Sequence, residues 1–241
     1  MEPMICLSIT NQGLNEQDII EEVKEIVQYH VDIVEWRVDA YDYRTDWEKV
    51  AQTLRLIREE LGATPLMLTF RDALEGGKME WTNQLWLEYL PFLEANVDLY
   101  DYVDIEMHNF MKMKDEDKTR IRELFHKGQI RLIGSYHNFL QMEEEDAIVN
   151  RFMGVLDQGI DIIKMAYQAK DTKEVQCLMR AATRCHEMAK ANQVFIPMGN
   201  VGRQVRLHPE LTFSSIAYCT TKDHSSIGQV TVKEYRKNRI G

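Results

Sequence analysis

The sequence predicts an α/β fold, a (β/α)8 TIM barrel formed by a single domain. Short apolar runs rich in branched residues alternate with longer stretches of helical periodicity from one end of the chain to the other. Eight such runs separated by helical stretches fit this barrel, and 241 residues is a usual length for it. No linker, low-complexity run or change in composition divides the chain, so we expect one domain spanning residues 1–241.

The strands are expected where apolar runs are too short for a helix and rich in branched or aromatic residues. A doubly wound open sheet is the alternative fold. The first strand, however, is followed by Thr10-Asn11-Gln12-Gly13 rather than by a Gly-x-Gly-x-x-Gly turn, which favours the barrel. The candidate strands are residues 4–9, 33–37, 65–70, 102–106, 130–136, 160–166, 194–197 and 215–218.

The helices are expected between the strands. Glycine readily takes the left-handed conformation that terminates a helix, so we expect helices to end at Gly62 and Gly128. We interpret the charge-rich stretch 112–122 as a solvated loop and helix start. The predicted helices cover residues 17–30, 47–61, 82–96, 118–127, 142–158, 172–192, 201–207 and 230–238.

Composition excludes several classes of protein. The formal net charge of −10 argues against a nucleic-acid-binding surface, which needs a basic face. The cysteines, Cys6, Cys177, Cys185 and Cys219, are scattered and form no Cys-x-x-Cys pair, as is typical of reduced thiols in a cytoplasmic protein. The histidines lack metal-ligand spacing, and we expect neither a metal nor a cofactor. We find no signal peptide and no stretch long enough to span a membrane.

Lys164 is the most unusual residue of the sequence, because it lies in the middle of the apolar run Ile162-Ile163-Lys164-Met165-Ala166. Burying an unpaired ammonium group is costly, so such a lysine is either paired with a carboxylate or held as a neutral amine. A neutral amine can attack a carbonyl carbon and form an imine. The run by itself leaves both a structural and a catalytic role open.

Polar residues gather where the predicted strands end, and in a (β/α)8 barrel this face carries the active site. Each residue alone could be an ion pair, a helix cap or a hydrogen-bonded loop residue. Their common position favours an active site that combines an amine nucleophile with a general base, which suits aldol cleavage or loss of water next to a carbonyl. The residues are Glu35, Arg37, Asp39, Arg71, Glu75, Asp104, Glu106, His137, Lys164, Arg203, Arg206, Tyr218, Ser225 and Gln229.

Two motifs are specific in combination: Glu35-Trp36-Arg37-Val38-Asp39, and Thr69-Phe70-Arg71 followed by Glu75-Gly76-Gly77. Other matching segments are Asp104-Ile105-Glu106, His137-Asn138-Phe139, Lys164, Met198-Gly199 with Gly202 and Arg206, and residues 225–229. Together they resemble the type I 3-dehydroquinate dehydratases, the Schiff-base enzymes of the shikimate pathway, over nearly the whole chain. The resemblance implies a hydro-lyase that converts 3-dehydroquinate to 3-dehydroshikimate in aromatic amino acid biosynthesis.

The resemblance also implies a role for each matched residue. Lys164 would form the imine with the C3 ketone, and His137 would take the C2 proton and then protonate the departing C1 hydroxyl. Glu75 would orient and tune His137. Arg206 would hold the substrate carboxylate, which suits a planar guanidinium fork. The other substrate-binding residues would be Ser8, Glu35, Arg37, Arg71, Ser225 and Gln229, and the pocket lining would be Met198, Tyr218 and Ser226.

Departures from the family pattern concern the closing loop and the two predicted strands before it. Ile196 replaces a common methionine, Tyr218 replaces a common phenylalanine, and the loop Ser225-Ser226-Ile227-Gly228-Gln229 lacks a common proline. Losing a fixed φ is expected to loosen this loop without changing the reaction.

Two other functions remain open: a class I Schiff-base aldolase on the same fold, and an inactive barrel that serves as a binding module. For the dehydratase we expect a cytoplasmic homodimer, as is common in the family. It would bind the small-molecule substrate 3-dehydroquinate, a carboxylate anion. We expect it to bind neither nucleic acid nor a membrane.

Overall fold

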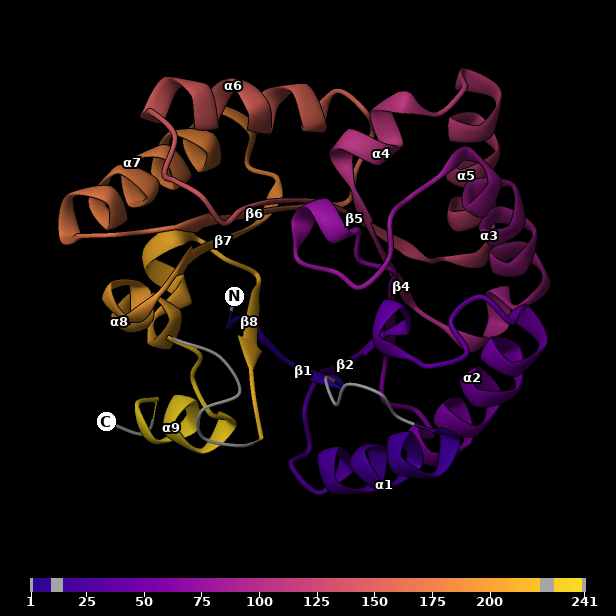
Figure 1. Ribbon diagram of the computed structural model, residues 1–241. Helices are drawn as coiled ribbons and strands as arrows, with labels where there is room; N and C mark the ends of the chain where they lie inside the picture. Colours follow the sequence, from indigo (N-terminus) through magenta and orange to yellow (C-terminus); the bar gives the residue numbers. More distant parts are fainter. Residues whose placement is uncertain (1, 10–14, 222–227, 240–241) are drawn as a thin grey trace. The chain divides into compact units, whose positions relative to one another are not determined.

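The computed structural model describes residues 2–9, 15–221 and 228–239 (Figure 1). Within these ranges, eight parallel strands are hydrogen-bonded in the order β7-β6-β5-β4-β3-β2-β1-β8. From β1 to β7, strands that follow one another in the sequence are therefore neighbours in the sheet, and β8 lies beside β1. The strands are β1 (Met4–Ile9), β2 (Ile33–Arg37), β3 (Leu66–Thr69), β4 (Tyr102–Glu106), β5 (Arg131–Asn138), β6 (Ile162–Gln168), β7 (Asn192–Met198) and β8 (Ile216–Cys219).

Helices connect these strands, as parallel neighbours require. The regular alternation of strand and helix is the (β/α)8 pattern that the sequence predicted. Among the described helices, none combines the length and the hydropathy needed to cross a bilayer. The helices are α1 (Glu16–Val27), α2 (Trp47–Leu61), α3 (Asn83–Ala95), α4 (Met107–Lys112), α5 (Asp115–Gly128), α6 (Glu145–Leu156), α7 (Thr172–Ala189), α8 (Arg203–Leu207) and α9 (Val232–Lys237).

The chain forms two compact units, here called the first half (Ser8–Leu132) and the second half (Met1–Leu7 with Ile133–Gly241). In the first half, β2 pairs with β3 and β3 with β4, all in parallel. In the second half, β5, β6 and β7 pair in turn, and β8 pairs with β1. An isolated bridge between Gln193 and Ser214 joins β7 to the segment that enters β8. That the whole chain is one domain stays a prediction.

Helix α2 illustrates how the sequence sets an element of the first half. The Asp46 side chain caps its first turn by accepting a hydrogen bond from the backbone N–H of Lys49 at 3.2 Å. Val50, Leu54 and Ile57 follow at helical spacing and are fully buried. Gly62 ends the helix with a φ of +56°, as the sequence predicted.

Helix α5 ends at Gly128, as the sequence predicted, although the left-handed residue that caps it is Gln129, with a φ of +58°. The predicted start of this helix at residue 118 is wrong. Lys112 closes α4 and α5 already begins at Asp115, so most of the stretch 112–122 is helical. Acidic residues in the first turn of α5 stabilise this early start, because they face the positive end of the helix dipole.

Strand β5 runs two residues beyond its predicted end. Asn138 still pairs with Tyr167 in the β5–β6 ladder, so His137 lies on the strand rather than in the following loop. The Asn138 side chain then accepts hydrogen bonds from the backbone N–H groups of Leu140 and Gln141, at 3.0 and 3.1 Å. This turn delays α6, which begins at Glu145 and not at residue 142.

Candidate active site

Lys164 lies at the third position of β6, and only 5% of its surface is exposed. Its neighbours along the strand, Ile163 and Met165, are fully buried. The Nζ atom lies 4.3 Å from the centre of the Tyr218 ring, which comes from β8. The prediction of a buried lysine inside an apolar strand is confirmed.

His137 lies on the neighbouring strand and on the same face as Lys164. In the parallel register of β5 and β6, Ser135 pairs with Lys164, and His137 pairs with Ala166. Because side chains alternate along a strand, residues two apart share a face. His137 and Lys164 are therefore diagonal neighbours, displaced by one side-chain repeat. The His137 ring also stacks on Phe139, with ring centres 6.3 Å apart.

A partly buried carboxylate holds the segment that follows His137. Glu143 accepts hydrogen bonds from the hydroxyl groups of Tyr136 and Tyr167, at 2.9 and 3.2 Å. Arg151 of α6 donates to the same carboxylate at 2.8 Å and covers the Tyr136 ring. These contacts tie the ends of β5 and β6 to α6 and fix the backbone on which His137 stands.

Arg206 lies on α8, which follows the tight turn after β7. The turn needs glycine at Gly202, since a Cβ there would lie 2.2 Å from the Pro197 carbonyl oxygen. Arg206 has no carboxylate or hydrogen-bond partner among the described residues, whereas Arg203 of the same helix pairs with Glu234 at 2.6 Å. Burial lowers the pKa of Arg206 to about 10, so the guanidinium keeps its charge at neutral pH.

The other predicted residues of the second half are placed as follows. Met198 ends β7 and pairs with Gln168 of β6, and its side chain is partly exposed. Tyr218 and Gln229 are also partly exposed. Ser225 and Ser226 lie outside the described residues.

In the first half, Glu35 and Arg37 do not form the ion pair that their spacing allows. Glu35 instead accepts hydrogen bonds from the hydroxyl groups of Ser8 and, at 2.7 Å, of Thr69. Arg37 donates to both oxygens of Asp39, at 2.7 and 2.8 Å. Three neighbouring strands thus supply the contacts around Glu35.

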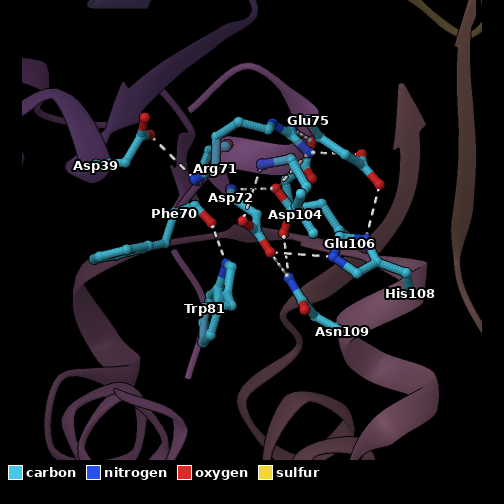
Figure 2. A network of polar contacts seen from close by, with 12 residues as sticks. Asp39, Phe70, Arg71, Asp72, Glu75, Trp81, Asp104, Glu106, His108 and Asn109 are labelled. Atoms are coloured by element: carbon cyan, nitrogen blue, oxygen red, sulfur yellow. Dashed lines mark hydrogen bonds and ion pairs between the residues drawn. The ribbon is translucent and has the colours of Figure 1, made fainter. Parts of the chain in front are cut away.

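Arg71 is the centre of a buried network in the first half (Figure 2). Its two terminal nitrogens donate to Glu106 and Asp104, each at 2.9 Å, and its backbone N–H donates to Asp39 at 3.1 Å. Although burial lowers the pKa of Arg71, the surrounding carboxylates raise it more, and the net pKa is raised. The guanidinium therefore stays charged and forms part of the structural network of the first half.

Glu75 lies at the end of the short 3-10 helix Ala73–Glu75, and 5% of it is exposed. One of its oxygens lies 3.8 Å from Arg71, and the other lies 2.9 Å from Nδ1 of His108. Figure 2 shows the His108 ring between Glu75 and Asp72. The predicted pairing of Glu75 with His137 joins residues of different halves and stays a prediction.

His108 was missed by the sequence reasoning, and the partners of Arg71 were identified only as polar rim residues. His108 comes two residues after Glu106, at the carboxyl end of β4, so its position after a strand end was an available signal. Among the described residues, no group of three or more histidines, cysteines or carboxylates is arranged to hold a metal ion.

The fold and the second half define a class of protein: a (β/α)8 barrel with a buried lysine on β6 and a histidine beside it, able to form an imine with a carbonyl compound. The model of the family "Type I 3-dehydroquinase" matches residues 5–238, and the chain belongs to this family. The predicted resemblance is confirmed.

Two curated relatives support this membership. The chain is 33% identical over 235 residues to a 3-dehydroquinate dehydratase of Alkaliphilus oremlandii, covering 97% of the chain and 89% of that protein. It is 33% identical over 228 residues to the 3-dehydroquinate dehydratase of Clostridium kluyveri, covering 93% and 87%. The aldolase and binding-module alternatives are not favoured by these relatives.

A solved structure confirms the fold class. The chain superimposes with a TM-score of 0.89 on a type I 3-dehydroquinate dehydratase from Clostridium difficile, crystallised with covalently modified comenic acid. The sequences are 27% identical, and the match covers 98% of this chain and 91% of that one.

Proposed function

We propose that this protein is a Schiff-base 3-dehydroquinate dehydratase, a hydro-lyase that converts 3-dehydroquinate to 3-dehydroshikimate and water without a cofactor. The family membership and the named relatives support the reaction. The observation that carries the mechanism is the buried Lys164 on β6, with His137 as its diagonal neighbour on the same face of the sheet.

In the proposed reaction, Lys164 attacks the C3 ketone of the substrate, and loss of water gives an iminium ion. The iminium draws electrons from the adjacent C2–H bond, and His137 takes the C2 proton. The resulting enamine expels the hydroxyl group at C1, which leaves as water after His137 returns a proton. Water then hydrolyses the conjugated imine, which releases 3-dehydroshikimate and regenerates the Lys164 amine.

Arg206 is the proposed receptor for the substrate carboxylate. The absence of a carboxylate partner among the described residues supports this role, because a charged guanidinium shielded from water gains most from a bidentate anion. Arg203 supports the contrast, since its side chain is already occupied by Glu234.

The remaining contacts are assigned by the family resemblance. We propose that Ser8, Glu35, Arg37 and Gln229 contact substrate and that Met198 and Tyr218 line the pocket. The predicted substrate contact Ser225 and the predicted lining residue Ser226 lie outside the described residues. Glu75 is the proposed carboxylate that tunes the catalytic histidine. Arg71 already binds two carboxylates, so we propose that it contributes mainly by fixing them.

The proposed setting is a cytoplasmic homodimer. The four cysteines are free thiols, which supports a reducing compartment. The dimer rests on the family resemblance alone, and light scattering of the purified protein tests it: a mass near twice 28.3 kDa is expected, and a mass of one chain would contradict it.

The reaction is tested by incubating the purified protein with 3-dehydroquinate and following the ultraviolet absorbance of the conjugated enone product. The wild-type protein should produce the enone, and Lys164→Met, which keeps a long unbranched side chain in the strand, should not. A folded wild-type protein that produces no enone would contradict the proposed function.

A further inference from the structure

His108 bridges two carboxylates of the first half. Its Nδ1 lies 2.9 Å from Oε1 of Glu75, and its Nε2 lies 3.1 Å from Oδ2 of Asp72. Both carboxylates are almost fully buried, whereas about a quarter of the His108 side chain is exposed. The ring comes from the first turn of α4, and both of its partners follow β3, so the contact joins two strand ends (Figure 2).

The proton count of this cluster follows from its geometry. The Asp72 oxygens already accept hydrogen bonds from the Asn109 side chain at 3.0 Å and from the Leu74 backbone at 3.1 Å. Burial raises the pKa of Asp72, but these hydrogen bonds and His108 lower it more, so Asp72 is ionised. An ionised carboxylate only accepts, and Nε2 of His108 must therefore carry a proton.

The second ring nitrogen holds Glu75. One proton lies between Nδ1 of His108 and Oε1 of Glu75, because two bare acceptors 2.9 Å apart would repel each other. Arg71 lies 3.8 Å from the other oxygen of Glu75. Glu75 is thus held from both sides, by His108 at one oxygen and by Arg71 at the other.

We propose that His108 is a positioning residue that orients the Glu75 side chain for catalysis. The proposal rests on the proposed function, in which Glu75 tunes the catalytic histidine. His108 is not a substrate contact in this assignment, and its effect on turnover passes through Glu75.

A double-mutant cycle tests this dependence. His108→Phe should lower kcat roughly ten-fold and leave KM within about two-fold, since the ring volume stays but the hold on Glu75 is lost. In a Glu75→Gln background the same His108→Phe change should have almost no further effect on kcat. His108→Gln, whose amide can still donate to Glu75, should recover most of the loss.

The outcomes separate the two proposals. If the wild-type protein lacks dehydratase activity, the proposed function fails before the cycle is run. If it is active, an unchanged kcat in His108→Phe overturns the role of His108. An equal loss in the Glu75→Gln background, with melting temperatures lowered to match, overturns it too and indicates a structural residue only. Borohydride trapping at Lys164 counts the competent sites in each variant.

Discussion

The side-chain nitrogen of Lys164 lies 4.3 Å from the centre of the Tyr218 ring, so the aromatic face of β8 covers the amine of β6. The ring supplies the cover over Lys164.

Tyr218→Phe should therefore keep kcat within about two-fold, whereas Tyr218→Ala should lower it roughly ten-fold, because water gains access to the imine. Steady-state kinetics with 3-dehydroquinate measures both. If both variants lose activity alike, the hydroxyl group matters and the ring-cover explanation is wrong.

Replacing His137 should separate imine formation from proton transfer. His137→Ala should still form the borohydride-trappable adduct, while kcat falls by about 10² to 10⁴, the usual contribution of a general acid and base. Mass spectrometry and the enone assay are run on the same sample. Full turnover in this variant would remove His137 from the mechanism.

Arg206 should control substrate affinity. Arg206→Lys keeps the charge but loses the planar fork, so KM should rise about ten-fold with a smaller change in kcat. Arg203→Lys on the same helix is the matched control, because the Arg203 side chain is bound to Glu234, and its KM should stay close to that of the wild type. Equal increases in KM for the two variants would argue against a specific carboxylate site.

Arg71 should matter for stability more than a surface arginine does. Arg71→Met leaves the buried Asp104 and Glu106 without their cation and should cost about 3–5 kcal/mol of unfolding free energy. Arg120→Met breaks the exposed pair with Glu94 and should cost less than about 1 kcal/mol. Urea unfolding measures both, and similar losses would show that the Arg71 network is not a structural centre.

Local patterns were enough to predict most of the fold. The helix over residues 47–61 has a capping aspartate, apolar residues at helical spacing and a terminal glycine, and its predicted bounds match the structure. The end of β5 was missed because polar Asn138 looks like a loop residue, yet it stays in the ladder opposite Tyr167. That pairing depends on a second strand, which periodicity along one segment does not show.

The candidate site was predictable in its residue types but not in its pairings. Lys164 is detectable because a lysine within an apolar strand is anomalous. Arg71 pairs with Asp104 and Glu106, and Glu75 pairs with His108. The partners in these pairs are more than thirty positions apart in the sequence and meet because they lie at neighbouring strand ends. No local spacing rule gives such pairs.

The central claim is that Lys164 forms an imine with 3-dehydroquinate, and chemical trapping tests it most directly. Sodium borohydride added together with 3-dehydroquinate should inactivate the protein, add the mass of the reduced ligand, and place that mass on the peptide containing Lys164. Lys164→Met should gain no mass under the same conditions. An unchanged intact mass in folded, treated wild-type protein would contradict the imine mechanism.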